Sequence, residues 1–146
     1  MSEARRKIDE INYEFNRANT LYSQWAQKQN LNLYTLLVYY MLHSYGSLSQ
    51  KQVSDSLKMP KQTVNHVIKA MSNDGHISLV TDDSDKRSKK IEFTDKGIAY
   101  ATELLTPLIT IEEKVFERLG EGRFQLIIEA TKAYGDILQE EMDKLD

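Results

Sequence analysis

The sequence predicts a mainly α-helical protein with one small β-hairpin, in the order α-α-α-α-β-β-α-α. This prediction depends on apolar residues that recur at helical spacing, on a capped pair of short helices in the middle of the chain, and on two alternating segments that follow them. A chain of 146 residues, 40% apolar and 28% charged, fits a single globular domain spanning 1–146.

Composition excludes several classes of function. The chain has no cysteine, so disulfides, thiolate metal sites and thiol redox sensing are ruled out. Its N-terminus is charged, and the longest apolar run, Leu36 to Leu42, falls far short of the roughly 20 residues that span a bilayer. We therefore expect a cytoplasmic protein without a membrane partner. Residues 58–96 hold eight bases and six acids, whereas residues 97–146 hold five bases and eleven acids, so the middle is mildly basic.

The first two predicted helices differ in how much of their surface is apolar. The segment 3–29 carries one apolar stripe, which suits packing along another helix. A second helix is expected from about Asn32, a fair N-cap, to Tyr45, and Gly46 ends it. It is apolar around most of its circumference, which predicts a central, buried position. The stripe of the first segment consists of Ile8, Ile11, Phe15, Ala18, Tyr22 and Trp25.

A capping box marks the start of the third helix. Ser49 is followed three residues later by Gln52, so a short helix is expected from Gln50 to Leu57. The sequence Lys58-Met59-Pro60 breaks it, and Pro60 suits the first turn of the next helix. Gly75 supplies the C-terminal stop of that fourth helix. Its buried stripe is predicted to be Val64, Val67, Ile68 and Met71.

Two short strands, residues 77–80 and 89–93, follow and are joined by a highly charged loop. Thr94 can cap a long helix that runs to about Arg118. Because proline cannot donate a backbone hydrogen bond, we expect a kink or break near Pro107.

A last helix is expected from Arg123 to about Leu145, after a turn at Gly120 and Gly122. Its apolar residues recur at helical spacing, as do those of the first helix. A single lobe cannot cover these stripes, so residues 1–30 and 98–146 are predicted to be dimerisation helices. The stripe of the last helix consists of Phe124, Ile127, Ile128, Thr131, Tyr134, Leu138 and Met142.

A short helix, a tight turn and a second helix, joined to a hairpin, make a winged helix-turn-helix, here residues 31–97. The predicted solvent-exposed face of the helix at about 60–73 carries hydrogen-bond donors and no acid, which suits a helix that binds in the DNA major groove. Thr63 either joins this face or packs against the preceding helix. The candidate DNA-binding residues of this helix are Lys61, Gln62, Thr63, Asn65, His66 and Lys69.

The hairpin loop, within a wing at about 81–90, concentrates both signs of charge. Arg87 is long, planar and always charged, which suits a narrow minor groove. Lys86 and Lys89, with Lys90 beside them, are placed to contact phosphates. Asp85 can accept hydrogen bonds from the turn backbone and steer the Arg87 guanidinium. The alternative is that the charged loop is only a solvated surface turn.

These motifs resemble the MarR family of transcriptional regulators. The run from Leu48-Ser49-Gln50-Lys51-Gln52 to Gly75 is similar to that family's helix-turn-helix. Asp85-Lys86-Arg87, the strand and Thr94-Asp95-Lys96-Gly97 match its wing signature, D-x-R followed by L-T-x-x-G, with Phe93 in place of the usual Leu. The resemblance covers nearly the whole chain.

The resemblance implies a homodimer with interlocked N- and C-terminal helices. Such a protein is expected to repress transcription at a palindromic operator in double-stranded DNA and to be released by a small-molecule effector. Carried across, Arg87 enters the minor groove, Asp85 supports the wing, and Lys61 to Lys69 form the recognition helix. In this family small aromatic effectors often bind between the dimerisation helices and the wing domain, but the sequence does not identify an effector for this chain.

The two alternatives to a DNA-binding regulator are a protein–protein adaptor and an enzyme. A winged-helix protein–protein adaptor would show an apolar or acidic recognition face. An enzyme would show a Cys nucleophile, a G-x-S-x-G elbow, a phosphate-cradling glycine loop or a convincing acid–base pair. None of these features is evident in the sequence. No cofactor is expected and no metal-ligand spacing is evident. We expect His43 to lie in the core or at an interface and His76 to cap or be solvated. The aromatic residues Trp25, Tyr34, Tyr39, Tyr40 and Tyr45 are expected in the core and dimer interface rather than around a pocket.

Overall fold

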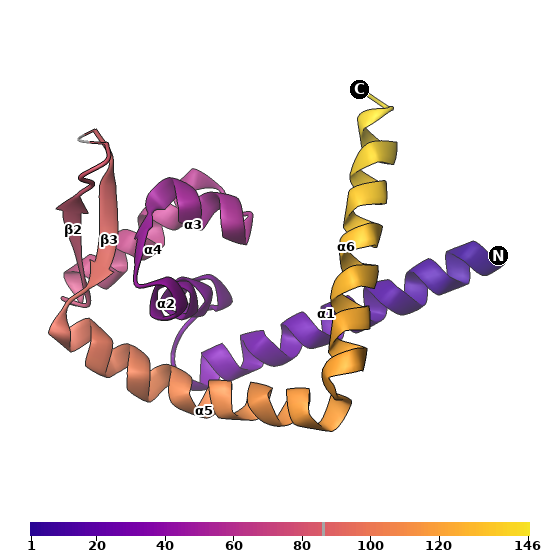
Figure 1. The fold of residues 1–146 in the computed structure, drawn as a ribbon, viewed down its shortest axis with the longest axis horizontal. Helices are drawn as coiled ribbons and strands as arrows, with labels where there is room; N and C mark the ends of the chain where they lie inside the picture. The colour runs from indigo at the N-terminus through magenta and orange to yellow at the C-terminus, as the bar shows by residue number, and fades with distance from the viewer. Residues whose placement is uncertain (86) are drawn as a thin grey trace. The chain divides into compact units, whose positions relative to one another are not determined.

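The computed structural model describes residues 1–85 and 87–146. Figure 1 shows the helices and strands in their order along the chain. The chain divides into two compact units, residues 1–104 and 105–146, and each is described by itself. The first unit holds α1 (Glu3–Lys28), α2 (Leu33–Tyr45), β1 (Ser47–Ser49), α3 (Gln50–Leu57), α4 (Lys61–Asn73), β2 (Ile77–Thr81) and β3 (Lys89–Phe93). Helix α5 (Asp95–Leu119) begins in the first unit and ends in the second, which also holds α6 (Glu121–Asp143).

Helix α2 lies at the centre of the first unit. It begins as predicted, since the side chain of Asn32 accepts a hydrogen bond of 2.8 Å from the Thr35 backbone amide. It contacts α1, α3, α4, β1 and β3. The predicted central position is therefore confirmed. Its buried side chains are Leu36, Val38, Tyr39, Met41 and Leu42.

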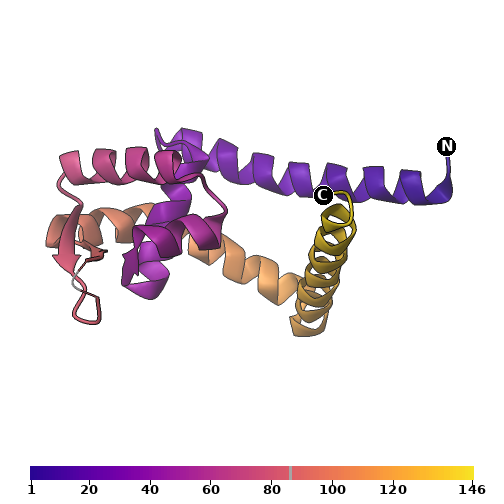
Figure 2. The ribbon, with the colours of Figure 1, turned by 90° about the horizontal axis from the view of Figure 1, so that it is seen from above.

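The sheet has one strand more than the sequence predicted. Its order is β1-β3-β2 with antiparallel pairing throughout, so β3 is the middle strand. Ile91 at the centre of β3 pairs with Leu48 of β1 on one side and Leu79 of β2 on the other, and it is fully buried. Strand β1 was missed because it is only three residues long and also supplies the N-cap Ser49. In Figure 2 the hairpin of β2 and β3 lies beside α4, with its loop at the far end of the strands.

Helix α5 begins as the sequence predicted. The backbone amide of Gly97 donates to the hydroxyl oxygen of Thr94 at 3.1 Å, which is an N-cap bond. Of the predicted kink or break near Pro107, the break is absent, because α5 continues through this residue to Leu119.

Helix α6 is unlike the helices of the first unit, because none of its residues is buried within the single chain. Gly120 precedes it with a φ of 86°, in the left-handed region that favours glycine. Phe124 of α6 contacts Phe116 of α5, with ring centroids 5.0 Å apart. In the part of the chain that the structure describes, no helix has both the length and the apolar content needed to cross a bilayer.

Candidate nucleic-acid interface

The recognition helix α4 divides into a buried and an exposed side. Val64, Val67, Ile68 and Met71 are at most 3% exposed, as the helical spacing predicted. The opposite side is open to solvent and carries donors without any acid. Thr63 is intermediate and lies between the two sides. The exposed polar residues are Lys61, Gln62, Asn65, His66 and Lys69.

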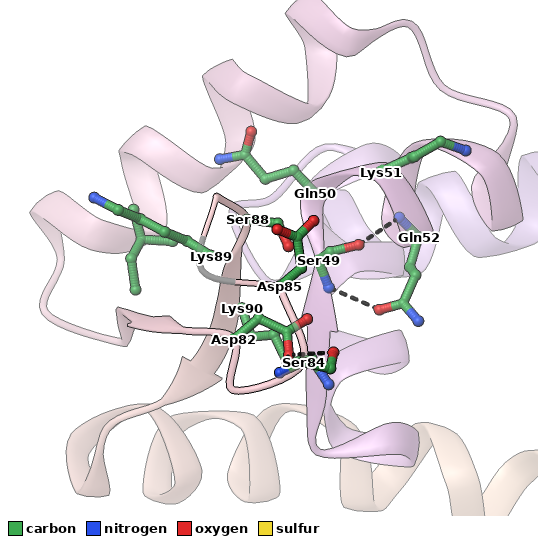
Figure 3. A pocket seen from close by; sticks show the side chains of 11 residues that line it. Ser49, Gln50, Lys51, Gln52, Asp82, Ser84, Asp85, Ser88, Lys89 and Lys90 are labelled. Atoms are coloured by element: carbon green, nitrogen blue, oxygen red, sulfur yellow. Dashed lines mark hydrogen bonds between the residues drawn. The ribbon is translucent and has the colours of Figure 1, made fainter.

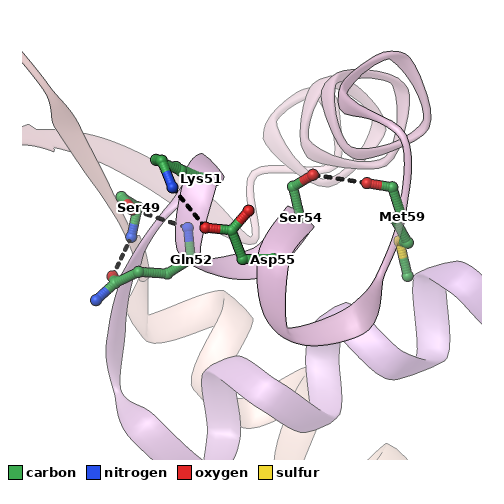
Figure 4. A network of polar contacts seen from close by, with 6 residues as sticks. All are labelled: Ser49, Lys51, Gln52, Ser54, Asp55 and Met59. Carbon is green, nitrogen blue, oxygen red and sulfur yellow. Dashed lines mark hydrogen bonds and ion pairs between the residues drawn. The ribbon is translucent and has the colours of Figure 1, made fainter. Parts of the chain in front are cut away.

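The turn between α3 and α4 is fixed by local hydrogen bonds (Figure 4). The Ser54 hydroxyl donates to the Met59 carbonyl at 2.6 Å, and the Met59 amide donates to the Ser54 carbonyl at 3.1 Å. Lys58 adopts a left-handed conformation with φ 52°, which ends α3 and allows the tight turn. These contacts set the position of α4 relative to α3.

The predicted capping box at the start of α3 is present. The Ser49 hydroxyl accepts from the Gln52 amide at 3.0 Å, and the Gln52 side chain accepts from the Ser49 amide at 2.8 Å. In the same turn, Lys51 forms an exposed ion pair at 2.6 Å with Asp55, which lies one turn further along α3. The hydrogen bond of this pair raises the pKa of Lys51 and lowers the pKa of Asp55. An exposed pair of this kind adds little stability, so Lys51 can exchange its partner for another anion.

In the wing loop, the acidic side chains hold the shape of the turn. Asp82 accepts from the Ser84 amide at 3.0 Å and from the Ser84 hydroxyl at 2.8 Å, and these bonds lower the pKa of Asp82. The Asp85 carboxylate accepts a hydrogen bond of 3.0 Å from the backbone amide of Arg87, as predicted for the turn. Among the described residues Asp85 bonds the backbone of Arg87, not its guanidinium. Arg87 and Lys89 are exposed, and Lys86 lies outside the described residues.

Two hollows connect the wing loop to the recognition helix. The larger, about 580 Å³, lies between the wing and the first turn of α3, and Figure 3 shows its lining. The smaller, about 300 Å³, lies between the first turn of α3 and α4, with Lys61 and Asn65 in its wall. Gln50 and Lys51 line both hollows. The first turn of α3 therefore joins the wing and α4 into one polar surface.

Gln50 and Lys51, which line both hollows, were not among the predicted site residues. Both lie in the first turn of α3, where backbone amides point outward and favour anions. The signal was present in the sequence, because a helix that precedes a recognition helix crosses the DNA backbone. Their place between the wing and α4, however, is visible only in the folded unit.

The two histidines outside α4 have different environments. His43 was expected in the core or at an interface; it is exposed on the last turn of α2, so it is not in the core of the single chain and the interface stays a prediction. His76 was expected to cap or be solvated; its backbone amide does cap α4 by donating to the Met71 carbonyl at 3.0 Å, but its side chain is 7% exposed and contacts Tyr39 and Tyr100. Residues from distant parts of the chain bury it, which local sequence does not reveal. Within residues 1–85 and 87–146, no group of histidine and acidic residues is arranged to hold a metal ion.

The aromatic residues near the middle of the chain have different environments. Tyr39 is buried, whereas Tyr34 and Tyr45 are 50% and 71% exposed. A hollow of about 310 Å³ lies beside His43, but the described residues that line it include none of these tyrosines. Tyr39 therefore belongs to the core as expected, whereas Tyr34 and Tyr45 do not, and for these two the dimer interface stays the prediction.

Solved structures with the same fold are transcriptional regulators. A MarR family regulator from Neisseria meningitidis matches with a TM-score of 0.86 and 26% identity, over 96% of this chain and 99% of that chain. Staphylococcus aureus MarR in complex with salicylate and kanamycin matches with a TM-score of 0.70 and 16% identity, over 94% and 93% of the two chains. Bordetella bronchiseptica BpsR, whose DNA binding is regulated by 6-hydroxynicotinic acid, matches with a TM-score of 0.67 and 19% identity, over 88% and 91%. No family model matches the chain, and no curated protein does.

The fold and the polar surface define a winged helix-turn-helix protein, and the neighbours support a DNA-binding transcriptional regulator rather than an enzyme. The resemblance to the MarR family that the recognition helix and the wing indicated is confirmed by these neighbours.

Proposed function

We propose that the protein is a homodimeric, sequence-specific transcriptional repressor that binds a palindromic operator. Helix α4 enters the major groove with Lys61, Gln62, Asn65, His66 and Lys69, and Thr63 lies at its edge. The wing reaches the minor groove with Arg87, supported by Asp85, while Lys86 and Lys89 contact phosphates. The observation that carries the proposal is that one continuous exposed surface runs from α4 across the first turn of α3 to the wing.

The exposed apolar residues of the terminal helices support dimerisation. A helix that buries nothing gains little from its own chain, since helix stability in proteins comes mainly from packing. Helix α6 is such a helix, and α1 exposes large apolar side chains as well. We therefore assign residues 1–30 and 98–146 to the interface between two copies. The exposed apolar residues are Ile8, Tyr13, Phe15 and Leu21 of α1, Ile98, Ile111, Val115 and Phe116 of α5, and Leu126, Ile127, Ile128, Ile137, Leu138 and Met142 of α6.

A two-fold pair presents two copies of α4 to one face of the duplex. The half-sites of the operator are then expected about one helical turn, roughly 34 Å, apart. A small-molecule effector that releases the DNA is proposed from the neighbours whose structures hold salicylate or concern 6-hydroxynicotinic acid. Because its DNA target lies there, we expect the protein to act in the cytoplasm.

The experiment that tests the proposal is a binding selection with the purified protein and fragments of genomic DNA. Recovery of fragments that share an inverted repeat supports a palindromic operator, and the flanking genes indicate what is regulated. Sedimentation of the free protein at the mass of two chains tests the dimer. Retention of no fragment above background, from a folded dimer at low salt, would reject DNA binding and favour the winged-helix adaptor.

A further inference from the structure

A short joint connects the two parts of the molecule that are proposed to contact DNA. Helix α4 ends at Asn73 and β2 begins at Ile77, so residues 74–76 alone separate the recognition helix from the wing. The position of the wing relative to α4 therefore depends on how this joint is held.

The start of α5 holds the backbone of the joint. Lys96 Nζ donates to the carbonyl of Asp74 at 2.8 Å, and the Thr94 hydroxyl donates to the carbonyl of Gly75 at 2.6 Å. The Thr94 backbone amide donates to the carbonyl of His76 at 3.0 Å. Three consecutive carbonyls are thus bonded by residues 94–96. We call residues 74–76 and 94–97 together the wing base.

The side chain of His76 links the wing base to the centre of the first unit. Its Nδ1 atom is hydrogen-bonded to the Tyr39 hydroxyl of α2 at 2.5 Å. Its ring stacks on Tyr100 of α5, with centroids 4.3 Å apart. Tyr39 in turn stacks on Phe93 at the end of β3, with centroids 6.0 Å apart. One buried imidazole therefore connects the wing base with α2 and α5.

The surroundings of His76 favour the neutral imidazole. Burial is the largest cause that lowers the pKa of His76, and Lys96 lowers it further, while Asp74 opposes them. Burial also raises the pKa of the Tyr39 hydroxyl, so Tyr39 keeps its proton and can donate it to Nδ1. The titratable and charged groups around His76 are accordingly Tyr39 from α2, Asp74 after α4, and Lys96 and Tyr100 from α5.

We propose that the buried Tyr39–His76 pair is a positioning element for DNA binding, and that a proton on His76 loosens the joint between α4 and the wing. A protonated imidazole carries hydrogen on both ring nitrogens, so Nδ1 no longer accepts from Tyr39. Among the described residues His76 is the hydrogen-bond partner of the Tyr39 hydroxyl, which would then have to turn away or accept instead. The inference rests on the proposed function, because it assigns a regulatory input to the same DNA-binding surface.

The sign of the pH effect follows from linkage. The pKa of His76 is lowered in the folded protein, so between that pKa and the unfolded value near 6.5 the unfolded chain binds more protons. Stability from His76 is therefore fully present above about pH 6.5 and is lost as the pH falls through the lowered pKa. Affinity for DNA is expected to fall in the same direction.

The test compares the wild-type protein with His76→Asn, whose amide offers a hydrogen-bonding group near the Nδ1 position but does not titrate. Urea unfolding without DNA is measured between pH 8 and pH 5.5, together with anisotropy titrations of a labelled DNA fragment recovered by the genomic selection. We expect acidification to lower both stability and DNA affinity several-fold more in the wild type than in the variant. The exposed His43 and His66 are present in both proteins, so their contributions cancel in this ratio.

Different results would contradict the proton coupling, the positioning role of His76 and DNA binding itself. Equal pH profiles of unfolding for the two proteins would overturn the proton coupling. A pH-dependent difference in stability with equal pH dependence of DNA affinity would overturn the positioning role and leave DNA binding in place. If wild type binds no DNA even at pH 8, the proposed function fails, and the positioning role fails with it. Should His76→Asn not fold, NMR titration of the wild-type imidazole decides, since a pKa at or above 6.5 contradicts the proposal.

Discussion

The base and the loop of the wing use charged and polar side chains for opposite purposes. In the wing base, the side chains of Thr94 and Lys96 donate hydrogen bonds to backbone carbonyls, and His76 is buried. In the wing loop, Asp82 and Asp85 form the turn and leave the cation of Arg87 exposed. Substitutions in the base should therefore act on folding as well as on DNA affinity, whereas substitutions in the loop should act on DNA affinity alone.

The difference also explains the two halves of the wing signature. Thr94 caps α5 and bonds the carbonyl of Gly75 with the same hydroxyl. A Cβ atom on Gly97 would overlap the carbonyl oxygen of His76, so only glycine fits there. The T-x-x-G half is thus needed for packing, whereas Arg87 of the D-x-R half has no packing role that would require its guanidinium.

The largest effect is expected from Gly97→Ala. The new methyl group would meet backbone rather than a flexible side chain, so α5 or the joint must shift. We expect a loss of about 3 kcal/mol in the free energy of unfolding, measured by urea denaturation. Gly122→Ala is the matched control, because its Cβ meets no atom within 4 Å in the single chain, and it should lower stability far less than Gly97→Ala does. Equal stability of both variants would show that the wing base is not tightly packed.

The sequence predicted the elements whose signals are local. The capping box at Ser49 and Gln52 and the buried stripe of α4 are patterns of residues three or four positions apart, and the structure contains both. The Thr94 cap was found for the same reason. Such contacts form within one helical turn, so a single sequence contains all the information they need.

Features that depend on distant partners were missed or misjudged. His76 is buried by Tyr39, which lies 37 positions earlier, and by Tyr100 of α5. Strand β1 exists because β3 pairs with Ser47 to Ser49. In the proposed DNA-binding surface, the helical spacing of apolar residues was enough to predict which residues of α4 are exposed. The place of Gln50 and Lys51 between two hollows could not be predicted in this way, because the hollows form only in the folded unit.

Arg87→Ala tests whether the wing loop acts on DNA affinity without affecting folding. The hydrogen bond to Asp85 uses the backbone amide of Arg87, which alanine retains, so the free energy of unfolding should not change. Affinity for the selected DNA should fall by more than about 1 kcal/mol, because a cation is withdrawn from the minor groove. Fluorescence anisotropy measures the affinity. Unchanged operator affinity in Arg87→Ala would reject its role.

Asn65→Ala and Lys89→Ala should separate sequence recognition from phosphate contact. Both residues are exposed, on α4 and β3 respectively. Loss of the Asn65 amide should cost about 1–3 kcal/mol on the preferred base and relax the sequence preference there. Loss of Lys89 should weaken all sequences alike and reduce the slope of log affinity against log salt by about 1. Binding-site selection at two salt concentrations measures both, and identical sequence preferences for the two variants would contradict this division.

The smallest effect is expected from comparing Asp85→Ala with Asp85→Asn. Both substitutions remove the same negative charge from the wing loop, but asparagine keeps an oxygen that can accept from the Arg87 amide. If Asp85 acts by holding the turn, the alanine variant should bind DNA more weakly than the asparagine variant by about 0.5 kcal/mol. If instead Asp85 acts on the guanidinium through its charge, the two variants should have equal affinities in the same anisotropy titration. The pair therefore decides whether the acid in the wing signature shapes the backbone or steers the arginine.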